Sequence, residues 1–460
     1  MSSISQVSET MQTILTSRAK ALERETGFVE RSSAQLDGPI FSQTIVLTWM
    51  HRPDASYSQL HHTAASLGVH GSLQALEQRF SQASARLMHA LLQEAVEQVI
   101  SSEARAPEVL TRFNGVYLQD GTVISLPPSL AQQLPGSGQE AALRVQARVE
   151  LASGSLTGVW LQEARVAERS GPAITTPLPV GSLFNADMGY FTLGEMRRRS
   201  KLGQYWLTHA KATLTLRDRQ GQWWDLLSFL EAQSCDEVDV EVIVGKRECV
   251  PMRLIAVRVS KEEAKRRRQR AHQQITHPPK GSQAPLPGKR KPKEQRRGKR
   301  KRKKVSAARL RLAEWTILLT NVPQDKLSVP EALVLVRCRG PLELLWKLWK
   351  QHGKLDTWRS YKPERIVTEI YAKLLGLIFT HWFALIGCWQ APDRSLVKAK
   401  QAVEWMTPCL ALAFAGVVAV ETVVERTAQT LSSGCRIDSR NKQPNTSQLL
   451  QRPKLIRGLG

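Results

Sequence analysis

The sequence predicts a mixed α/β fold, with a central sheet and helical regions at both ends of the chain. Apolar and polar residues alternate with a period of two in the stretch LRVQARVEL, residues 143–151, which predicts a half-buried strand. A helix is predicted over Leu193–Lys201, after several such strands, and this succession is typical of a layered α/β domain. The chain has 460 residues, 42% of them hydrophobic, so it is long enough for two or three domains with buried cores.

Residues 1–110 are predicted to form a helical domain. Helices are predicted over Ser56–Ala65, Ser72–Phe80 and Ser81–Ser101, and Ser72 can cap the second of them, in which apolar residues recur at helical spacing. The first two resemble a helix-turn-helix, whose second helix can enter the major groove of DNA. The side chains that would read bases from this helix are Gln74, Gln78 and Arg79. The alternative is that these short helices only pack against their neighbours.

Residues 111–210 are predicted to form the first part of the central sheet. The expected strands are Val116–Leu118, Val123–Leu126, Leu143–Leu151, Leu156–Ala164, Gly181–Ala186 and Tyr205–Ala210. Asp120 and Asp187 each follow an apolar run and precede a glycine, so both are expected at strand ends, where a turn leaves room for a ligand. A single aspartate at such a position is equally compatible with an ordinary turn.

Residues 211–314 are predicted to be rich in strands and to contain a strongly basic segment. The expected strands are Ala212–Leu216, Val238–Val244 and Met252–Val259. Residues 261–304 carry 19 lysines and arginines and three glutamates, within a chain whose formal net charge is +24. Because this segment has few apolar side chains, we expect it to be disordered and to bind DNA through counterion release. A solvated linker and a nuclear localisation signal are the alternatives.

The stretch VRCRGPLELLWKLWK, residues 336–350, is predicted to contain an amphipathic helix. Offsets of three, four and seven residues return to one face of a helix. One stripe would therefore consist of Glu343, Trp346, Lys347 and Lys350. The opposite, buried face would carry Leu344, Leu345 and Leu348. The stripe combines a carboxylate that can bind a metal ion with cations that can bind phosphate, although charges that are merely solvated would give the same pattern.

Together these motifs resemble the DDE transposases of bacterial insertion sequences, which have an RNase H-like catalytic core. The matching segments are LQDGTVISLP around Asp120, ADMGYF around Asp187, and WTILLTN from Trp315. The family signature Tyr-x2-Arg-x3-Glu-x6-Lys is matched at Arg339, Glu343 and Lys350. The resemblance implies that residues 211–314 are the family's β-rich insertion and that residues 315–392 complete the core with the catalytic helix. Residues 393–460 would then be a helical C-terminal region with a polar tail.

The resemblance also implies a reaction, Mg²⁺-dependent DNA strand cleavage at terminal repeats followed by strand transfer. Two Mg²⁺ ions, for which Mn²⁺ can substitute, would activate the nucleophile and neutralise the leaving group, and carboxylates are suitable ligands for them. The catalytic and metal-binding residues would be Asp120, Asp187 and Glu343. Residues contacting DNA phosphate would be Arg339, Lys347 and Lys350. The partner would be double-stranded DNA from the element ends and the target, bound by a homodimer.

The sequence departs from the family signature in two ways. Val336 stands where relatives have tyrosine, and Gly340 and Pro341 follow the signature arginine where relatives continue a helix. Proline fits the first turn of a helix but breaks its interior, so the catalytic helix is expected to begin near Pro341, with Arg339 just before it. These departures leave an alternative function, a catalytically inactive, transposase-derived protein that only binds DNA.

Trp315 has a further role by the same resemblance. In hairpin-forming relatives, the tryptophan of this motif enters the space left by a flipped base, for which an indole offers a stacking face. The alternative is a tryptophan packed inside a strand. Gly340 stands where some relatives have a second stacking tryptophan, so the sequence does not decide between hairpin formation and other cleavage routes.

The residues after Pro363 are predicted to be helical and apolar. The stretch Ala402–Val424 is the one most similar to a membrane span, but Pro408 interrupts it and charged residues flank a short apolar run. We expect a buried helix there, and a membrane-associated basic protein is the alternative. The polar N-terminus predicts no signal peptide, and six scattered cysteines fit a reducing compartment. With the family resemblance, this indicates the bacterial cytoplasm, in association with the nucleoid.

Overall fold

The computed structural model describes residues 3–29, 35–102, 106–136, 140–276, 305–389, 391, 393–437 and 446–459. The chain divides into two compact units by its internal contacts. Unit 1 contains Met1–Asn185 and Arg337–Arg452, and unit 2 contains Ala186–Val336 and Pro453–Gly460.

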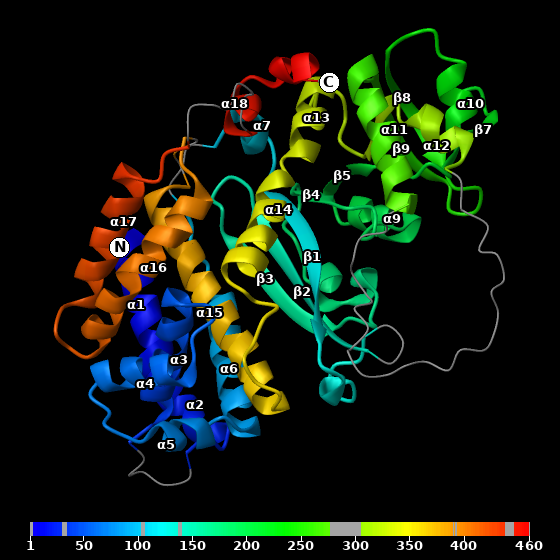
Figure 1. Ribbon diagram of the computed structural model, residues 1–460. Helices are drawn as coiled ribbons and strands as arrows, with labels where there is room; N and C mark the ends of the chain where they lie inside the picture. The colour runs from blue at the N-terminus through cyan, green and yellow to red at the C-terminus, as the bar shows by residue number, and fades with distance from the viewer. Residues whose placement is uncertain are drawn as a thin grey trace, which may run out of the picture. The chain divides into compact units, whose positions relative to one another are not determined.

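Unit 1 is a helical body joined to a sheet. Its N-terminal helices are α1 (Ser3–Thr13), the π-helical turn η1 (Ile14–Arg18), α2 (Ala19–Glu25), α3 (Gly38–His51), α4 (Tyr57–Ser66), α5 (Leu73–Gln78), α6 (Gln82–Glu97) and α7 (Glu108–Thr111). Its later helices are α14 (Gly340–Lys347), the π-helical turn η4 (Leu348–His352), α15 (Pro363–Gly387), α16 (Leu396–Phe414), α17 (Val420–Ser433) and α18 (Thr446–Gln451). Helices from the two ends of the chain lie side by side, because α15 packs on α3 and α6, and α17 packs on α1 (Figure 1).

The three helices predicted around residues 56–101 are present, and a serine caps the N-terminus of each, as was predicted for Ser72. Ser56 and Gln59 form a capping box at α4, and Ser81 and Ser84 form one at α6. The Ser72 hydroxyl accepts a hydrogen bond from the backbone N–H of Ala75 at the start of α5, at 3.1 Å. These caps satisfy backbone donors that the first turn of each helix would otherwise leave unpaired.

The strands of unit 1 lie in the order β3-β2-β1-β4. They are β1 (Val116–Leu126), β2 (Ala141–Glu150), β3 (Leu156–Glu163) and β4 (Leu183–Ala186), with short helical turns η2 (Pro128–Leu130), η3 (Glu168–Ser170) and α8 (Pro172–Thr175) between them. Strands β1 and β2 are antiparallel, and Asp120 lies opposite Ala147. The prediction that Asp120 ends a strand is therefore wrong. Gly121 continues the ladder opposite Gln146, so one strand replaces the two short ones that were expected.

Helix α15 is the buried centre of unit 1. It is long and apolar enough to cross a membrane by length and composition, with a mean hydropathy of 1.5, but 83% of that apolar window is buried inside the protein. It is the one such helix in the part of the chain that the structure describes. The stretch 402–424, expected to be one buried helix, is instead divided between α16, which ends at Phe414, and α17, which begins at Val420.

His381 on α15 is buried and should make the stability of unit 1 depend on pH. Its Nε2 donates a hydrogen bond to the carbonyl oxygen of Gly154 at 2.8 Å, and burial lowers the pKa of the imidazole to about 4. Between pH 6.5 and 4 the unfolded chain binds more protons, so stability is complete above the unfolded pKa and is lost as the pH falls. We expect this residue to lower the free energy of unfolding by about 3 kcal/mol over that window.

The measurement is urea unfolding of the wild-type protein and of His381→Gln at several pH values. The glutamine amide can still donate to Gly154 but does not titrate. A smaller pH dependence in His381→Gln is expected, and parallel curves for the two proteins would contradict the assignment.

Unit 2 contains a second group of strands in the order β5-β10-β9-β8-β6-β7. They are β5 (Tyr205–His209), β6 (Thr215–Arg217), β7 (Trp223–Asp225), β8 (Glu237–Val244), β9 (Val250–Arg258) and β10 (Trp315–Thr320). The helices are α9 (Leu193–Lys201), α10 (Leu226–Glu231), α11 (Lys261–Thr276), α12 (Ala307–Leu312), α13 (Val329–Arg337) and the turn η5 (Pro453–Leu459). Each neighbouring pair from β5 to β7 is antiparallel. The predicted α/β fold with helical regions at both ends is confirmed.

The beginning of the basic segment is a helix, not the disordered chain that we expected. In α11, Glu263 pairs with Arg267 one turn later at 3.2 Å, and the Arg267 guanidinium donates to the carbonyl of Trp315 at 3.0 Å. Ala264 and Ala271 are buried on the same helix. These contacts of Arg267 offset part of the repulsion among the lysines and arginines of α11, Lys261–Thr276. The remainder of the segment, 277–304, lies outside the described residues.

Candidate active site

Strand β1 and helix α14 bring together two segments that lie 226 residues apart in the sequence. The indole Nε1 of Trp346 donates a hydrogen bond to Oδ2 of Asp120 at 3.1 Å. The Arg339 guanidinium lies 3.9 Å from Oδ1 of the same carboxylate. Asp120 is thus oriented by two side chains of the α14 segment, while about a fifth of it, 22%, stays exposed to solvent.

Glu343 lies on the same face of α14 as these two side chains. Its backbone N–H donates to the carbonyl of Arg339 at 3.1 Å, so the helical geometry includes Arg339. Residues three or four positions apart on a helix have Cβ atoms about 5–6 Å apart. Glu343 is four residues after Arg339 and three before Trp346, and both of those contact Asp120. The exposed carboxylate of Glu343 therefore belongs to the same surface as Asp120.

The stripe predicted on this helix is only partly solvent-exposed. Glu343 and Lys347 are exposed, but Trp346 is only 7% exposed and packs against the Trp349 ring at a centroid distance of 5.2 Å. Sequence reasoning placed Trp346 on the correct face but missed its hydrogen bond to Asp120. The three-residue spacing from Glu343 indicated the shared face of the helix but not the partner of Trp346. Leu345 and Leu348 are buried as predicted, whereas Leu344 is only half-buried.

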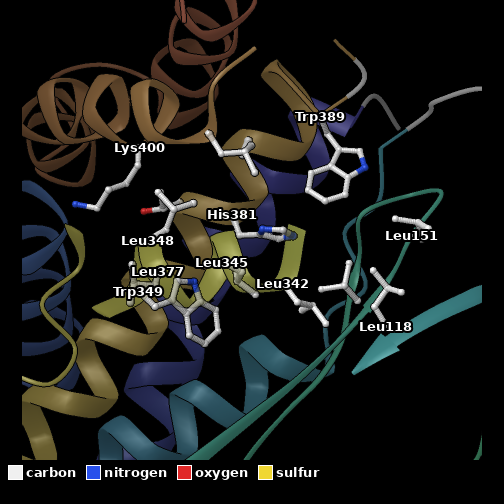
Figure 2. A pocket seen from close by; sticks show the side chains of 14 residues that line it. Leu118, Leu151, Leu342, Leu345, Leu348, Trp349, Leu377, His381, Trp389 and Lys400 are labelled. Carbon is white, nitrogen blue, oxygen red and sulfur yellow. The ribbon is translucent and has the colours of Figure 1, made fainter. Parts of the chain in front are cut away.

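The other face of α14 rests on the apolar interior of unit 1. A small cavity of about 40 Å³ separates Leu342, Leu345 and Leu348 from α15, the beginning of the α15–α16 connection and the first turns of α16 (Figure 2). Its walls also include Leu118 of β1 and Leu377 of α15. Apolar contacts hold α14 on one side, and the contacts of Trp346 and Arg339 with Asp120 hold it on the other. The position of Glu343 on the helix follows from this packing.

The two lysines of the segment are placed differently. Lys347 is exposed, whereas Lys350 in η4 is half-buried and donates from Nζ to the backbone carbonyl of Val123 on β1 at 2.8 Å. Partial burial lowers the pKa of the Lys350 ammonium, an effect that the charge of Asp356 opposes. Lys350 thus holds η4 against β1 close to Asp120.

The start of α14 agrees with the expectation from its proline. Arg339 is the N-cap residue, the helix begins at Gly340, and the proline lies in the first turn, where no backbone donor is lost. Val336, which replaces the signature tyrosine, is buried near the end of α13.

Asp187 directly follows β4 and is exposed, as predicted for a strand end. The Asp187 carbonyl accepts a hydrogen bond from the backbone N–H of Tyr190 at 3.0 Å, which closes the turn through Gly189. The residue belongs to unit 2, and Asp120 and Glu343 belong to unit 1. The structure brings Asp120 and Glu343 to one surface within unit 1.

The two carboxylates on this surface of unit 1 suit a hard divalent cation. Asp120 and Glu343 offer only carboxylate oxygens, which Mg²⁺ prefers. No group of three or more histidine, cysteine or acidic side chains lies close enough to hold a metal ion within the described residues. All six cysteines are free.

Comparison with known proteins decides the family. Residues 112–379, more than half of the chain, match the transposase DDE domain. The chain belongs to the DDE transposase family. The matched region begins just before β1 and ends within α15, so it includes Asp120, Asp187 and Glu343.

Individual relatives agree with the identification made from the sequence motifs. The transposase for insertion sequence element IS231B of Bacillus thuringiensis subsp. berliner is 21% identical over 77% of this chain and 74% of the relative. The transposase for IS231C of the same subspecies is 23% identical over the same shares. The transposase for IS1151 of Clostridium perfringens is 20% identical over 67% of this chain and 65% of the relative.

Trp315 of this transposase begins β10 in unit 2. Its side chain is 6% exposed, and the Arg258 guanidinium lies over its ring, 4.5 Å from the centroid. The register places Trp315 opposite Arg258 on β9. The indole is therefore packed within its own unit in this structure.

The predicted base-reading residues of the transposase lie on or next to α5. Gln74 and Gln78 are exposed. The Arg79 guanidinium lies over the ring of Phe28, 4.3 Å from the centroid, and donates to the carbonyl of Leu36. Burial lowers the pKa of this guanidinium. Arg79 therefore joins α5 to the segment before α3, a role that the sequence did not indicate.

Proposed function

We propose that this transposase catalyses divalent-metal-dependent DNA strand cleavage and strand transfer at the terminal repeats of a bacterial insertion sequence. The observation that carries the proposal is the pairing of β1 with α14, in which Trp346 and Arg339 reach Asp120 and flank Glu343. Membership of the DDE family supports the same reaction class. Double-stranded DNA is the substrate in this proposal, and the protein acts on it as a homodimer in the bacterial cytoplasm.

Asp187 is the third carboxylate of the proposed site. Strand β4 neighbours β1, and Asp187 is two residues beyond Asn185, the last residue of unit 1 in this strand. In the proposal, the carboxylate that follows β4 would complete the metal-binding set with Asp120 and Glu343.

Each group has a role in the proposed reaction. Two Mg²⁺ ions held by Asp120, Asp187 and Glu343 would lower the pKa of the attacking hydroxyl and neutralise charge at the leaving group. Arg339 is suited to bidentate contact with a phosphate next to Asp120. Lys347 on α14 and Lys350 in η4 would supply point charges for other phosphates. Trp346 keeps one oxygen of Asp120 in a fixed orientation. Gln74 and Gln78 are the proposed base readers, and Trp315 remains a candidate for stacking on a flipped base.

The direct test uses the purified protein and DNA carrying the inverted repeats that flank its own coding region. We expect strand cleavage at the repeat ends with Mg²⁺ or Mn²⁺ and none with EDTA, followed by joining to a target plasmid. DNA with scrambled ends is the control. Binding to the repeats without cleavage under any metal condition would instead identify an inactive DNA-binding descendant.

Trp346→Phe should weaken the binding of Mg²⁺ without removing any of the proposed metal ligands. Phenylalanine keeps an aromatic ring against Trp349 but cannot donate to Asp120, so the carboxylate loses one of its orienting contacts. Loss of a group that orients a metal ligand typically costs about 10- to 100-fold in metal affinity or activity. We expect the Mg²⁺ concentration for half-maximal cleavage to rise by that factor. Trp349→Phe, which leaves Asp120 untouched, is the matched control, and equal Mg²⁺ titrations for both variants would contradict the role.

A further inference from the structure

The loop between η4 and α15, residues Gly353–Lys362, carries an aromatic side chain that the proposed reaction does not use. The Tyr361 side chain is 95% exposed, the most exposed of the large hydrophobic side chains in the described residues. Arg359 and Lys362 on either side of it are exposed as well. A large aromatic ring therefore lies in solvent between two cations, in the loop that follows the catalytic helix segment.

The loop is held in one shape by the core beneath it. The Nζ of Lys373, which is only 3% exposed, donates to the carbonyls of Lys354 at 3.1 Å and Thr357 at 2.7 Å. Leu355 is fully buried, and its N–H donates to the carbonyl of Trp349 at 3.1 Å. Placing a charged lysine in the core is costly, and here it fixes the loop backbone. The first half of the loop is thus tied to the core, four residues before Tyr361.

Ion pairs connect the same loop to the N-terminal helices. Lys354 Nζ lies 2.7 Å from Asp54, just before α4, and Lys362 Nζ lies 3.3 Å from Glu77 on α5. At the start of α15, the Arg365 guanidinium lies over the ring of Tyr57 of α4, 3.3 Å from the centroid. The Gly353–Lys362 loop therefore bridges the catalytic helix segment and helix α5, which carries Gln74 and Gln78.

An exposed aromatic ring between cations is a combination that binds unpaired nucleotides. The ring stacks on a base, whatever its identity, and the cations contact the flanking phosphates. An exposed pair such as Lys362 with Glu77 is weak, so phosphate can compete for this lysine. We propose that the Gly353–Lys362 loop binds unpaired nucleotides of the DNA substrate, with Tyr361 stacking on a base and Arg359 and Lys362 contacting phosphate. This inference rests on the proposed function only in taking the bound nucleic acid to be the DNA substrate.

The test compares two DNA probes, a blunt duplex and the same duplex with a short single-stranded tail. Fluorescence anisotropy with the full-length protein in EDTA measures binding without any cleavage. We expect the wild-type protein to bind the tailed duplex more tightly, and Tyr361→Leu to lose roughly 5- to 150-fold in affinity for it, the range for one base–aromatic stack. Affinity of Tyr361→Leu for the blunt duplex should be unchanged.

Two further variants make the result specific. Tyr361→Phe keeps the ring and should bind both probes like the wild-type protein. Trp405→Leu removes a second highly exposed aromatic side chain, on α16, and should also have no effect. The proposal is overturned if wild type does not prefer the tailed probe, if Tyr361→Leu weakens both probes equally, or if Tyr361→Phe behaves like Tyr361→Leu. A protein that cleaves repeat ends but fails these criteria keeps its proposed function and loses only this inference.

Discussion

Asp120→Asn is expected to reduce metal-dependent strand cleavage by about 1000-fold or more, because removal of a group central to catalysis typically costs at least that much. Asparagine keeps the shape of the side chain and an oxygen that can accept the hydrogen bond from Trp346. It lacks the negative charge that a bound cation requires. The measurement is cleavage of end-containing DNA in Mg²⁺, with DNA binding in EDTA measured in parallel.

Binding by Asp120→Asn should be equal to wild type or tighter, since one negative charge near the DNA is removed. Asp325→Asn, which changes an exposed aspartate of unit 2, is the control for the loss of a carboxylate. Substantial cleavage by Asp120→Asn would show that the nucleophile does not depend on this residue, and the assignment of the site would be wrong.

Glu369→Gln is expected to lower the free energy of unfolding by about 3–5 kcal/mol, the usual cost of removing one partner from a buried ion pair. Glu369 lies 2.9 Å from Lys373 and 3.9 Å from Arg365, and all three side chains are almost completely buried on α15. Burial raises the pKa of the Glu369 carboxyl, and the two neighbouring cations oppose this shift. Glutamine would leave both cations buried without a carboxylate.

Urea unfolding monitored by circular dichroism measures this effect. Glu364→Gln, one turn earlier on the same helix and only half-buried, is the matched control and should have little effect. Equal destabilisation by the two substitutions would show that the Glu369 carboxylate does not stabilise the buried charges of Arg365 and Lys373.

The local elements of the fold were largely predictable from the sequence because their signals are local. The helix Leu193–Lys201 has the predicted bounds, and Ser72 caps the helix that follows it, as predicted. Strand β1 was misread because Gly121 usually signals a turn, whereas pairing with β2 keeps it extended. The packing of α17 against α1 leaves no local signal at all, since it joins residues from opposite ends of the chain.

In the candidate site, too, the features with local sequence signals were predictable and the tertiary contacts were not. The residue types and the spacing from Arg339 to Lys350 were sufficient to identify α14 and the position of its first turn. The partner of Trp346 could not be predicted, because a hydrogen bond to Asp120 depends on how α14 docks on β1. Arg79 was assigned to base reading from its position in a short helix, but its stacking on Phe28 is a tertiary contact.

The joining of both chain ends in one helical body has a consequence for synthesis of this protein. Helix α3 leaves the ribosome long before its neighbours α15 and α16, with roughly 300 residues translated in between. At about 5–20 residues per second, its apolar side chains wait some 15–60 s for their partners. Until then, the side of α3 that faces α15 and α16 is open to chaperone binding. A copy truncated before α15 would leave this side of α3 uncovered.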